Sequence, residues 1–361
     1  MSKTINIPLG SQHIALLEPV HFTFECENEQ IINATADVGY VHRGVELACA
    51  SKFRFKQVGY VVSRVCGLCA IIHATCYTLA VEQIMGVEVS RRAQWLRILA
   101  NELDRVHSHL LCLAHTAENA GFEALFMQTM KDRELVMESQ EALYGNRVQF
   151  DYVNIGGVNR DLDANSVAVL KDKLAKLYEK SENLMSLFTT NFSLSMKYKD
   201  IGVISKEKAL LYSAIGPIAR ASGVAMDVRS DSSYLPYNEV GYELILESGG
   251  DIHARNMIRL REIKNSLDMM QNIINGLPEG ELISKVTGAP EGEGFMRVEA
   301  PRGECFYYVK GVKNQTLDRV KIKTPTFACI PVMIDTFIGS NYADAAAILA
   351  SFDPCMSCTA K

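Results

Sequence analysis

Two Cys-x-x-Cys pairs stand near opposite ends of this 361-residue sequence, and they are the residues best suited to chemistry. The first pair is Cys66 and Cys69, and the second is Cys355 and Cys358, which ends three residues before the last residue. Thiolates are soft ligands for zinc, nickel, copper and iron, and two thiols separated by two residues can bind one ion from a single turn. Because four such sulfurs complete a first coordination shell, the spacing predicts a metal site, with redox metals as the leading candidates.

A structural zinc site is the simplest alternative. Zinc ribbons usually keep their two cysteine pairs within a few dozen residues, so that the metal closes a small loop in place of a hydrophobic core. Here nearly the whole chain separates the pairs, and 48% of its residues are hydrophobic. Because such a chain can build a core without metal, the pattern favours a reactive metal. A structural zinc scaffold remains the alternative.

The composition narrows the class of protein and its compartment. Lys and Arg total 37 against 42 Asp and Glu, and no concentrated basic run occurs, so nucleic-acid binding has no electrostatic support. Ten cysteines without an amino-terminal signal peptide predict a reducing, cytoplasmic setting. The longest apolar stretches, residues 60–81 and 328–338, are interrupted by Arg64, His73 and Asp335. We therefore expect any membrane role to come through partner subunits.

No linker rich in proline, glycine or serine divides the chain, which predicts one domain over residues 1–361. Within it we expect a β-hairpin region over residues 1–60 and a helical core over residues 61–285. Residues 286–361 should form a β region followed by the carboxy-terminal metal-binding segment. The predicted fold class is α+β, predominantly α-helical, with small sheets near the N-terminus and before the C-terminus.

The apolar periodicity predicts the individual elements. Residues 21–26 and 31–40 are expected to be strands joined by a polar turn, and Ser90 should cap a long helix whose apolar stripe faces the core. Further helices are predicted over residues 132–144, 164–188, 239–274 and 342–352, and β structure over residues 292–312. Gly249 and Gly250 weaken the third of these helices. Pro354 should end the last one and deliver Cys355 to the site.

The segments around the cysteines, residues 64–69 and 353–358, resemble the two nickel–iron motifs of the [NiFe] hydrogenase large subunit. Further segments resemble that family in its order: residues 10–13 (GSQH), 43–46 (RGVE), 105–110 (RVHSHL), 156–158 (GGV) and 299–304 (EAPRGE). The sequence is most similar to the energy-converting, membrane-associated branch, including the Ech-like and CO-induced hydrogenases. That branch is related to the quinone-site subunit of respiratory complex I. The resemblance implies a fold with a central helical bundle.

The resemblance also implies unequal roles for the four cysteines. Cys66 and Cys355 would be terminal nickel ligands, whereas Cys69 and Cys358 would bridge nickel and an iron that carries two cyanides and one carbonyl. Soft thiolates can stabilise nickel through changes in its oxidation state. A terminal thiolate such as Cys355 can also take a proton, which heterolytic cleavage of hydrogen requires.

Three further residues would take part in catalysis if the resemblance holds. It places Glu18 beside Cys355 as a proton relay, although composition alone favours a solvated loop glutamate. It places Arg302 over the metals, where the guanidinium could bind a diatomic ligand, with Asp353 as its partner. Taken alone, Arg302 is a turn arginine before a glycine and Asp353 a helix terminator.

Glu46 matches a family glutamate that binds a second ion, magnesium or iron, near the carboxy terminus. A hard oxygen ligand suits magnesium, but a glutamate at a helix start is also favoured by the helix macrodipole. Family members are often cut three residues after the last cysteine, next to a histidine or arginine. Lys361 stands at that position, which puts the second ion in doubt because a protonated ammonium group cannot be a ligand.

The other histidines and cysteines have more modest expected roles. His107 and His109 are two residues apart and so lie on different faces of the predicted helix, where we expect buried or interface side chains with hydrogen bonds. His13 resembles a quinone-pocket histidine of complex I relatives, and no catalytic role is expected for it. The remaining cysteines lack paired spacing and should be small buried hydrophobes; they are Cys26, Cys49, Cys76, Cys112, Cys305 and Cys329.

The resemblance implies several partners, because electrons that leave nickel need iron–sulfur clusters and this sequence has no further cysteine motif for one. They are a small iron–sulfur subunit, further iron–sulfur and integral-membrane subunits that move ions, and a ferredoxin-type electron donor, on the inner face of the cell membrane. Hydrogen and protons would be the substrates. The main functional alternative is a quinone-site module related to complex I. Retention of all four cysteines, which complex I relatives lack, favours the hydrogenase.

Overall fold

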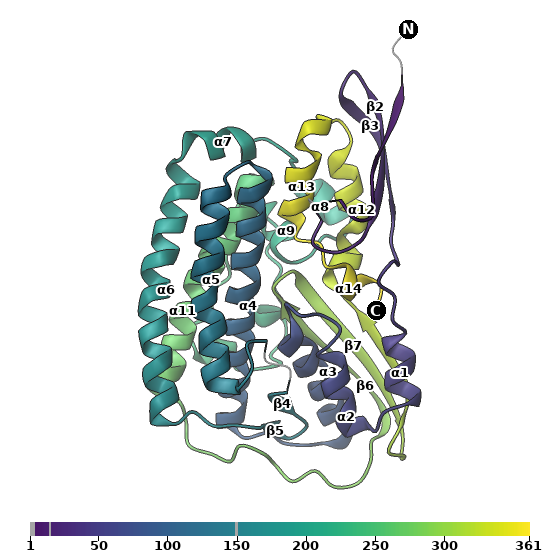
Figure 1. The fold of residues 1–361 in the computed structure, drawn as a ribbon. Helices are drawn as coiled ribbons and strands as arrows, with labels where there is room; N and C mark the ends of the chain where they lie inside the picture. Colours follow the sequence, from purple (N-terminus) through teal and green to yellow (C-terminus); the bar gives the residue numbers. More distant parts are fainter. Residues whose placement is uncertain (1–3, 14–15, 149–150) are drawn as a thin grey trace.

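Four long helices lie side by side in the computed structural model, which describes residues 4–13, 16–148 and 151–361 (Figure 1). They are α4 (Arg91–Asn119), α5 (Glu123–Tyr144), α6 (Ala164–Thr190) and α11 (Ile252–Gly276). α4 packs against α5 and α11, and α6 packs against the same two helices. The expected central helical bundle is therefore confirmed, and Ser90 caps α4 by accepting a hydrogen bond from the backbone N–H of Ala93, as predicted.

The amino-terminal sheet is antiparallel and contains one strand more than the sequence predicts. Its strands are β1 (Ile5–Leu9), β2 (His21–Glu27) and β3 (Gln30–Asp37). The turn residues Asn28 and Glu29 both have positive φ, as a two-residue hairpin turn requires. β1 escaped prediction because it is a short, mostly exposed edge strand with a proline, so it shows no apolar alternation.

A second antiparallel sheet precedes the carboxy terminus. It consists of β6 (Glu291–Ala300), β7 (Gly303–Val312) and β8 (Leu317–Lys323). Residues of β7 alternate between buried and partly exposed, and Cys305 and Tyr307 lie on the buried face, against which α3 (Ala70–Met85) packs. Only Pro301 and Arg302 separate β6 from β7, so the hairpin turn presents Arg302. The expected small peripheral sheets are thus confirmed.

Shorter elements connect the bundle to the sheets. The remaining helices are α1 (Val45–Ser51), α2 (Phe55–Val62), α7 (Phe192–Tyr198), α8 (Lys206–Leu211), α9 (Gly216–Ala221), α10 (Val228–Asp231), α12 (Pro325–Phe337), α13 (Ala345–Phe352) and α14 (Met356–Thr359). The short strands β4 (Val153–Asn154) and β5 (Gly157–Val158) form a hairpin, and two 3-10 turns are η1 (Tyr237–Glu239) and η2 (Tyr342–Asp344).

Several predicted boundaries were wrong, most clearly at residues 239–274. The helix there begins only at Ile252, after Asp251, which caps it by accepting a hydrogen bond from the Ala254 N–H. Gly250 adopts φ +65°, and its N–H donates to the Ala221 carbonyl at 2.8 Å. This segment is therefore hydrogen-bonded to the end of α9 and does not continue the helix. In addition, α5 starts at Glu123, earlier than expected, and the helix predicted from residue 342 begins with the turn η2.

α4 is buried on its polar face as well as on the apolar stripe that the sequence predicts. Leu99 and Leu103 are fully buried, but Arg97 and Arg105 are buried too. Each guanidinium has a buried carboxylate partner, Glu82 at 2.7 Å and Glu102 at 3.1 Å. Buried charges are tolerated when they are paired and hydrogen-bonded. α4 is therefore covered on all sides by other elements and is the central helix of the molecule.

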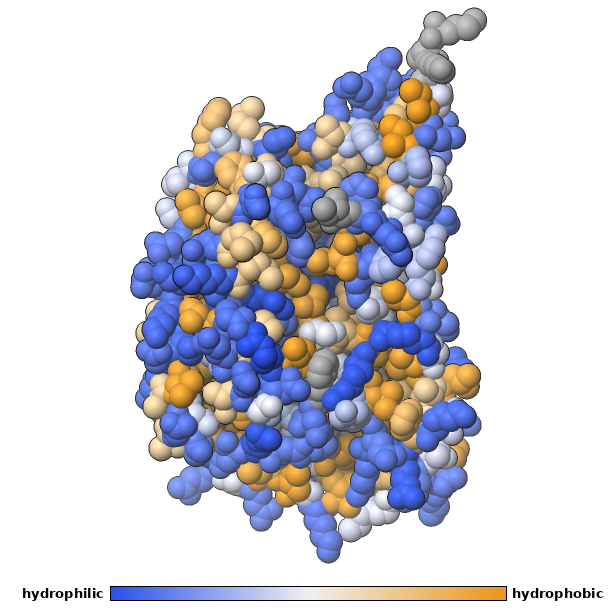
Figure 2. All heavy atoms as spheres, in the orientation of Figure 1, coloured by the Kyte–Doolittle hydropathy of each residue, from blue (hydrophilic) through white to orange (hydrophobic). Residues whose placement is uncertain are grey.

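Figure 2 shows hydrophilic and hydrophobic residues interspersed over the face that it presents. Within the described ranges, no helix combines the length and the apolar character that a membrane crossing requires.

Candidate metal centre

The two cysteine pairs come from opposite ends of the chain and each occupies the start of a helix. Cys69 directly precedes α3, and Cys355 directly precedes α14, which contains Cys358. Cys66 lies in the turn between α2 and α3. All four side chains are buried, with exposed fractions of 2% for Cys355 and Cys358, 3% for Cys66 and 4% for Cys69.

The four sulfurs converge in the core, as the spacing predicts. Cys66 Sγ lies 3.4 Å from Cys355 Sγ, and Cys69 Sγ lies 3.7 Å from Cys358 Sγ. The sulfurs of Cys66, Cys69 and Cys358 all lie within 4.8 Å of one another. These separations are far longer than the roughly 2.05 Å of a disulfide bond, so the thiols are free. Their arrangement offers several soft ligands to one small volume.

The electrostatics of the four thiols also fit a bound cation. Hydrogen bonds from Cys355, Cys358 and Cys69 hold the pKa of Cys66 well below its ordinary value. Hydrogen bonds to Cys355, Cys66 and Cys69 raise the pKa of Cys358 well above its ordinary value. One thiolate at this spacing thus suppresses ionisation of its neighbours, because like charges repel strongly in a buried site. All four can be thiolates together only beside positive charge, which metal ions would supply.

Arg43 ties the two cysteine segments together. Its Nη1 donates to the Arg64 carbonyl at 3.0 Å, and its Nη2 donates to the carbonyls of Val65 at 2.8 Å and Ser357 at 3.0 Å. The planar guanidinium can serve several acceptors at once, which suits it to this bridging position. The sequence marks Arg43 as part of a family motif, but its clamping role is visible only in the structure.

Asp353 and Arg302 form a buried ion pair, the partnership that the family resemblance implies. Arg302 Nη2 donates to Asp353 Oδ1 at 2.7 Å, and Arg302 Nε donates to the Asp353 carbonyl at 2.6 Å. Asp353 ends α13 in the left-handed region at φ 55°, which non-glycine residues seldom adopt, and Pro354 follows it. The sharp change of direction places Cys355 directly after the pair.

Burial disfavours the charged form of both members of this pair, but the net result favours the charged form only for Arg302. Burial opposes the charge on Arg302, but Asp353 and the cysteine sulfurs outweigh it and hold the pKa of Arg302 well above its ordinary value. Burial raises the pKa of Asp353, an effect that Arg302 partly offsets. The guanidinium is therefore a firmly fixed positive charge beside the four sulfurs.

Two contacts hold the turn that carries Arg302. Arg105 in α4 donates to the carbonyl of Glu299 at 2.8 Å and to that of Ala300 at 3.3 Å, which anchors the end of β6. On the other side, a Cβ added to Gly216 would lie 2.3 Å from the Arg302 carbonyl oxygen. Only glycine permits this close approach of α9. The position of Arg302 is thus determined by a bundle helix and by α9 together.

Glu18 lies against the second cysteine motif, where its hydrogen-bond partner is Ser357, two residues after Cys355. Its carboxylate accepts hydrogen bonds from the backbone N–H of Ser357 at 2.9 Å and from the Ser357 hydroxyl. A small cavity of about 20 Å³ is lined by Glu18, His115, Asp353 and neighbouring residues. That volume can hold about one water molecule between polar groups.

His73 is a polar neighbour of the cysteines to which the sequence analysis assigned no role. Its Nε2 lies 3.3 Å from Cys358 Sγ, and its Nδ1 lies 2.7 Å from the hydroxyl oxygen of Tyr307. A signal was present, because His73 follows Cys69 by four residues and so lies one helical turn further along α3. The partner Tyr307 has no local signal, since it comes from a distant strand.

His107 and His109 are buried, as expected, and point to different partners. His109 Nε2 lies 2.9 Å from Glu262 Oε2, whereas His107 Nε2 contacts the guanidinium of Arg133. Burial lowers the pKa of His109 to about 4 and that of His107 to about 3, so both rings are neutral near pH 7. His13 is exposed in the segment between β1 and β2. All six cysteines outside the two motifs are buried, as predicted.

The surroundings of Glu46 fit an ion pair better than a second metal ion. Glu46 Oε1 accepts from the Ile322 N–H at 2.9 Å, and Oε2 accepts from Lys321 Nζ at 3.1 Å. Lys323 and Lys361 line the same pocket. A hard divalent cation needs several oxygen ligands, and three lysines around one carboxylate oppose it. The second metal site stays a prediction that these contacts do not support.

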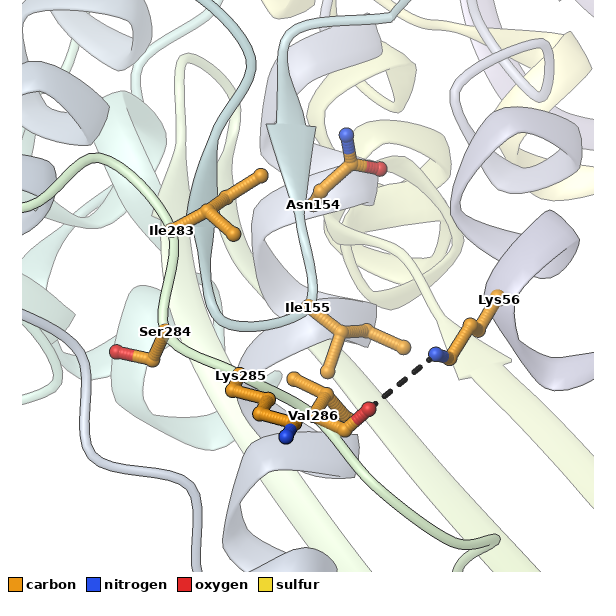
Figure 3. Close-up of a pocket in the computed structure, with 7 residues that line it drawn as sticks. All are labelled: Lys56, Asn154, Ile155, Ile283, Ser284, Lys285 and Val286. Carbon is orange, nitrogen blue, oxygen red and sulfur yellow. Dashed lines mark hydrogen bonds between the residues drawn. The ribbon is translucent and has the colours of Figure 1, made fainter.

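A separate surface cleft lies away from the cysteines (Figure 3). It has a volume of about 250 Å³ and is lined by residues of α2, the β4–β5 hairpin and the segment 283–286. Lys56 Nζ reaches across it to the Val286 carbonyl at 3.4 Å. Its seven labelled residues include no cysteine, histidine or carboxylate, so none of them is a usual metal ligand.

Comparison with known families agrees with the fold and the cysteine motifs. Residues 119–287 and 282–361 match the family described as the respiratory-chain NADH dehydrogenase 49 kDa subunit. Residues 43–117, which include the first cysteine pair, match the nickel-dependent hydrogenase family. Together the two matches cover most of the chain.

Individual relatives span nearly the full length. The chain is 35% identical over 360 residues to the carbon monoxide-induced hydrogenase of Rhodospirillum rubrum, covering 99% of both chains. It is 33% identical over 372 residues to the membrane-bound hydrogenase subunit alpha of Pyrococcus furiosus, covering 98% of this chain and 87% of the other. The solved structure of a membrane-bound sulfane sulfur reductase, an archaeal respiratory membrane complex, includes a chain that superposes with a TM-score of 0.93. It is 29% identical and the match covers 99% and 98% of the two chains.

The helical bundle, the two three-stranded sheets and the buried cysteine group accord with these relatives, two of which are named as parts of membrane-bound complexes. The chain belongs to the large-subunit family that the energy-converting, membrane-bound [NiFe] hydrogenases share with the 49 kDa subunit of respiratory complex I.

Proposed function

We propose that this chain is the catalytic subunit of an energy-converting [NiFe] hydrogenase, which interconverts protons and hydrogen. The observation that carries the proposal is the convergence of four buried sulfurs from two Cys-x-x-Cys motifs 289 residues apart. The match to the nickel-dependent hydrogenase family over residues 43–117 supports the identity of the metal. A zinc scaffold would not need the buried Arg302–Asp353 pair beside the sulfurs.

The proposed roles of the cysteines are those that the resemblance to the [NiFe] hydrogenase motifs implies. Cys66 and Cys355, whose sulfurs are 3.4 Å apart, would hold nickel as terminal ligands, and Cys69 and Cys358 would bridge nickel and iron. When bound, a nickel–iron centre with cyanide and carbonyl on iron supplies heterolytic cleavage of hydrogen and electron transfer. The Leu68 N–H donates to Cys66 Sγ at 3.3 Å and so stabilises the thiolate form of that ligand.

Arg302 and Asp353 would act on the same centre through charge. The Arg302 guanidinium donates to Ser108 Oγ at 3.2 Å in addition to its two bonds with Asp353, so its plane is held on three sides. A fixed guanidinium beside a buried reacting site can stabilise developing negative charge and bind a diatomic ligand. We assign Arg302 this electrostatic role, and Asp353 the role of orienting it.

Protons would leave through the carboxy-terminal segment. The Cys355 sulfur holds the proton, and Glu18, hydrogen-bonded to Ser357, receives it for transfer to the surface. The water-sized cavity that Glu18 lines together with His115 supports the later part of this route, because one water molecule there could receive the proton from the carboxylate.

Replacing the Glu18 carboxylate tests the proton route. Glu18→Gln keeps an acceptor for the Ser357 N–H but cannot take up a proton, so nickel and iron content should be unchanged. Hydrogen–deuterium exchange catalysed by the purified complex should slow by about 100-fold, the lower range for loss of a general base. Glu123→Gln, an exposed residue in the first turn of α5, is the matched control. Loss of nickel from Glu18→Gln would instead assign the residue a structural role.

The proposed partners are a small iron–sulfur subunit, further iron–sulfur and integral-membrane subunits, and a ferredoxin-type electron donor. The relatives named as a membrane-bound hydrogenase subunit and as part of a respiratory membrane complex support this assembly. With no membrane-spanning helix among its described residues, the chain would sit peripherally on the inner face of the cell membrane, held by those partners.

Infrared spectroscopy and metal analysis of the intact complex test the function directly. We expect nickel and iron in the purified complex and absorption bands from cyanide and carbonyl bound to iron. Zinc without nickel, together with the absence of those bands, would overturn the proposal in favour of a zinc-stabilised scaffold.

The second candidate is a quinone-site module, and the match of residues 119–361 to the 49 kDa subunit family favours it. A quinone site does not depend on thiolate ligands. Quinone-dependent activity that survives Cys66→Ser or Cys355→Ser would support this candidate over the hydrogenase.

A further inference from the structure

Three buried side chains form a line that ends at a proposed bridging ligand. The Tyr307 hydroxyl lies 2.7 Å from His73 Nδ1, and His73 Nε2 lies 3.3 Å from Cys358 Sγ. The three residues come from β7, α3 and α14, and their exposed fractions are 0%, 1% and 2%. Because no water competes for these hydrogen bonds in such a buried site, each hydrogen bond strongly affects the next side chain in the series.

The direction of each hydrogen bond follows from proton counting. A metal-bound thiolate carries no proton, so the contact between His73 and Cys358 requires a proton on His73 Nε2. A neutral imidazole has one N–H, which leaves Nδ1 as an acceptor. In that tautomer of the neutral ring, Tyr307 donates its hydroxyl proton to Nδ1. Burial raises the pKa of Tyr307 well above its ordinary value, so the hydroxyl keeps that proton to donate.

Tyr307 is a better donor to His73 than its other polar neighbour. Cys305 Sγ lies 3.9 Å from His73 Nδ1, a distance at which sulfur makes only a weak hydrogen bond, whether it donates or accepts. Tyr307 is also held in place on both sides, because it pairs with Met296 of β6 and Ile322 of β8 in the middle of the sheet. The hydroxyl therefore meets the imidazole from a rigid support.

We propose that Tyr307 is a positioning residue, which holds His73 in the tautomer that donates a hydrogen bond to the Cys358 sulfur. This inference rests on the proposed nickel–iron function. A hydrogen bond to a bridging sulfur withdraws electron density from it and, through it, from the iron. Groups outside the ligand shell tune a metal centre in this way by fixing the tautomer of a histidine.

Infrared spectroscopy of the intact complex with Tyr307→Phe tests the proposal. Without the Tyr307 hydroxyl, nothing holds the His73 tautomer that carries its proton on Nε2. The hydrogen bond from His73 to the Cys358 sulfur is then formed in a smaller fraction of the molecules. The Cys358 sulfur would then be a stronger electron donor to iron, so the carbonyl band should shift to lower wavenumber at unchanged nickel and iron content. Tyr308→Phe is the matched control, because Tyr308 is the next residue of β7 on the opposite, partly exposed face.

A second variant separates the tautomer from simple packing. In the His73→Gln variant, the side-chain amide can donate a hydrogen bond to the Cys358 sulfur with or without the Tyr307 hydroxyl. Adding Tyr307→Phe in that background should leave the carbonyl band where His73→Gln alone places it. If Tyr307→Phe lowers the metal content in this background too, Tyr307 acts through packing and the assignment is wrong.

The outcomes also distinguish this inference from the function on which it rests. A carbonyl band that is present in the unmodified complex but unmoved by Tyr307→Phe overturns the role of Tyr307 and leaves the hydrogenase proposal standing. The absence of carbonyl and cyanide bands from the unmodified complex overturns both.

Discussion

Cys66→Ser and Cys355→Ser are each expected to abolish hydrogen turnover. A serine hydroxyl is a harder and far less acidic ligand than a thiol, so it does not replace a thiolate on nickel. Changes outside the ligand shell already cost 10- to 100-fold in metal affinity or activity, and loss of a ligand should exceed about 100-fold. The measurements are nickel content and hydrogen–deuterium exchange of the purified complex.

Cys26→Ser is the matched control for both variants. Cys26 is buried in β2, outside the cysteine group. Its replacement by serine should therefore leave hydrogen turnover and nickel content unchanged. Hydrogen turnover that persisted in Cys66→Ser would contradict the assignment of Cys66 as a nickel ligand. Equal loss in Cys26→Ser would show that the assay reports folding and not metal binding.

Arg302→Met should cause the largest loss of stability among changes near the site. The substitution leaves the Asp353 carboxyl buried without its partner and removes the bond to the Asp353 carbonyl that supports the turn before Cys355. Breaking a buried ion pair from one side costs about 3–5 kcal/mol. The measurement is denaturant-induced unfolding of the complex, with hydrogen exchange of residues 345–361 as a local readout. Hydrogen turnover should fall as well.

Two comparisons make the Arg302 prediction specific. Arg297→Met removes a partly exposed pair with Glu304 on the same hairpin, where side-chain exposures are 45% and 21%, so it should cost no more than about 1 kcal/mol. Arg302→Met combined with Asp353→Asn leaves no unpaired charge and should recover part of the stability. A double variant no more stable than the single one would contradict the ion-pair explanation.

The Arg302→Met variant should also depend on pH in a definite direction. Burial raises the pKa of Asp353 in the folded chain above its value in the unfolded chain. A group with a raised folded-state pKa binds its proton more tightly when folded, so its stabilising effect is present in acid and is lost as pH rises through that pKa. The variant should therefore be most stable at the acidic end of its range.

The sequence by itself predicted the features that depend on neighbouring residues. The spacing of Cys66 and Cys69 predicts two ligands from one turn, and Ser90 and Pro354 predict where helices begin and end, because capping and proline geometry act within a few residues. The same local rules failed at residues 239–251, where Gly250 binds α9 and no helix forms. They also missed β1, whose exposed residues carry no alternation.

Only the tertiary structure decided how the site is assembled. Cys66 faces Cys355, and Cys69 faces Cys358, across 289 residues of sequence, and Arg43 binds the backbones of both motifs. The approach of Tyr307 to His73 and the turn that aims Arg302 at Asp353 likewise depend on how β7, α3 and α4 pack. Covalent geometry and helix propensity act over a few residues, whereas these contacts follow from burial of whole elements, which no local pattern encodes.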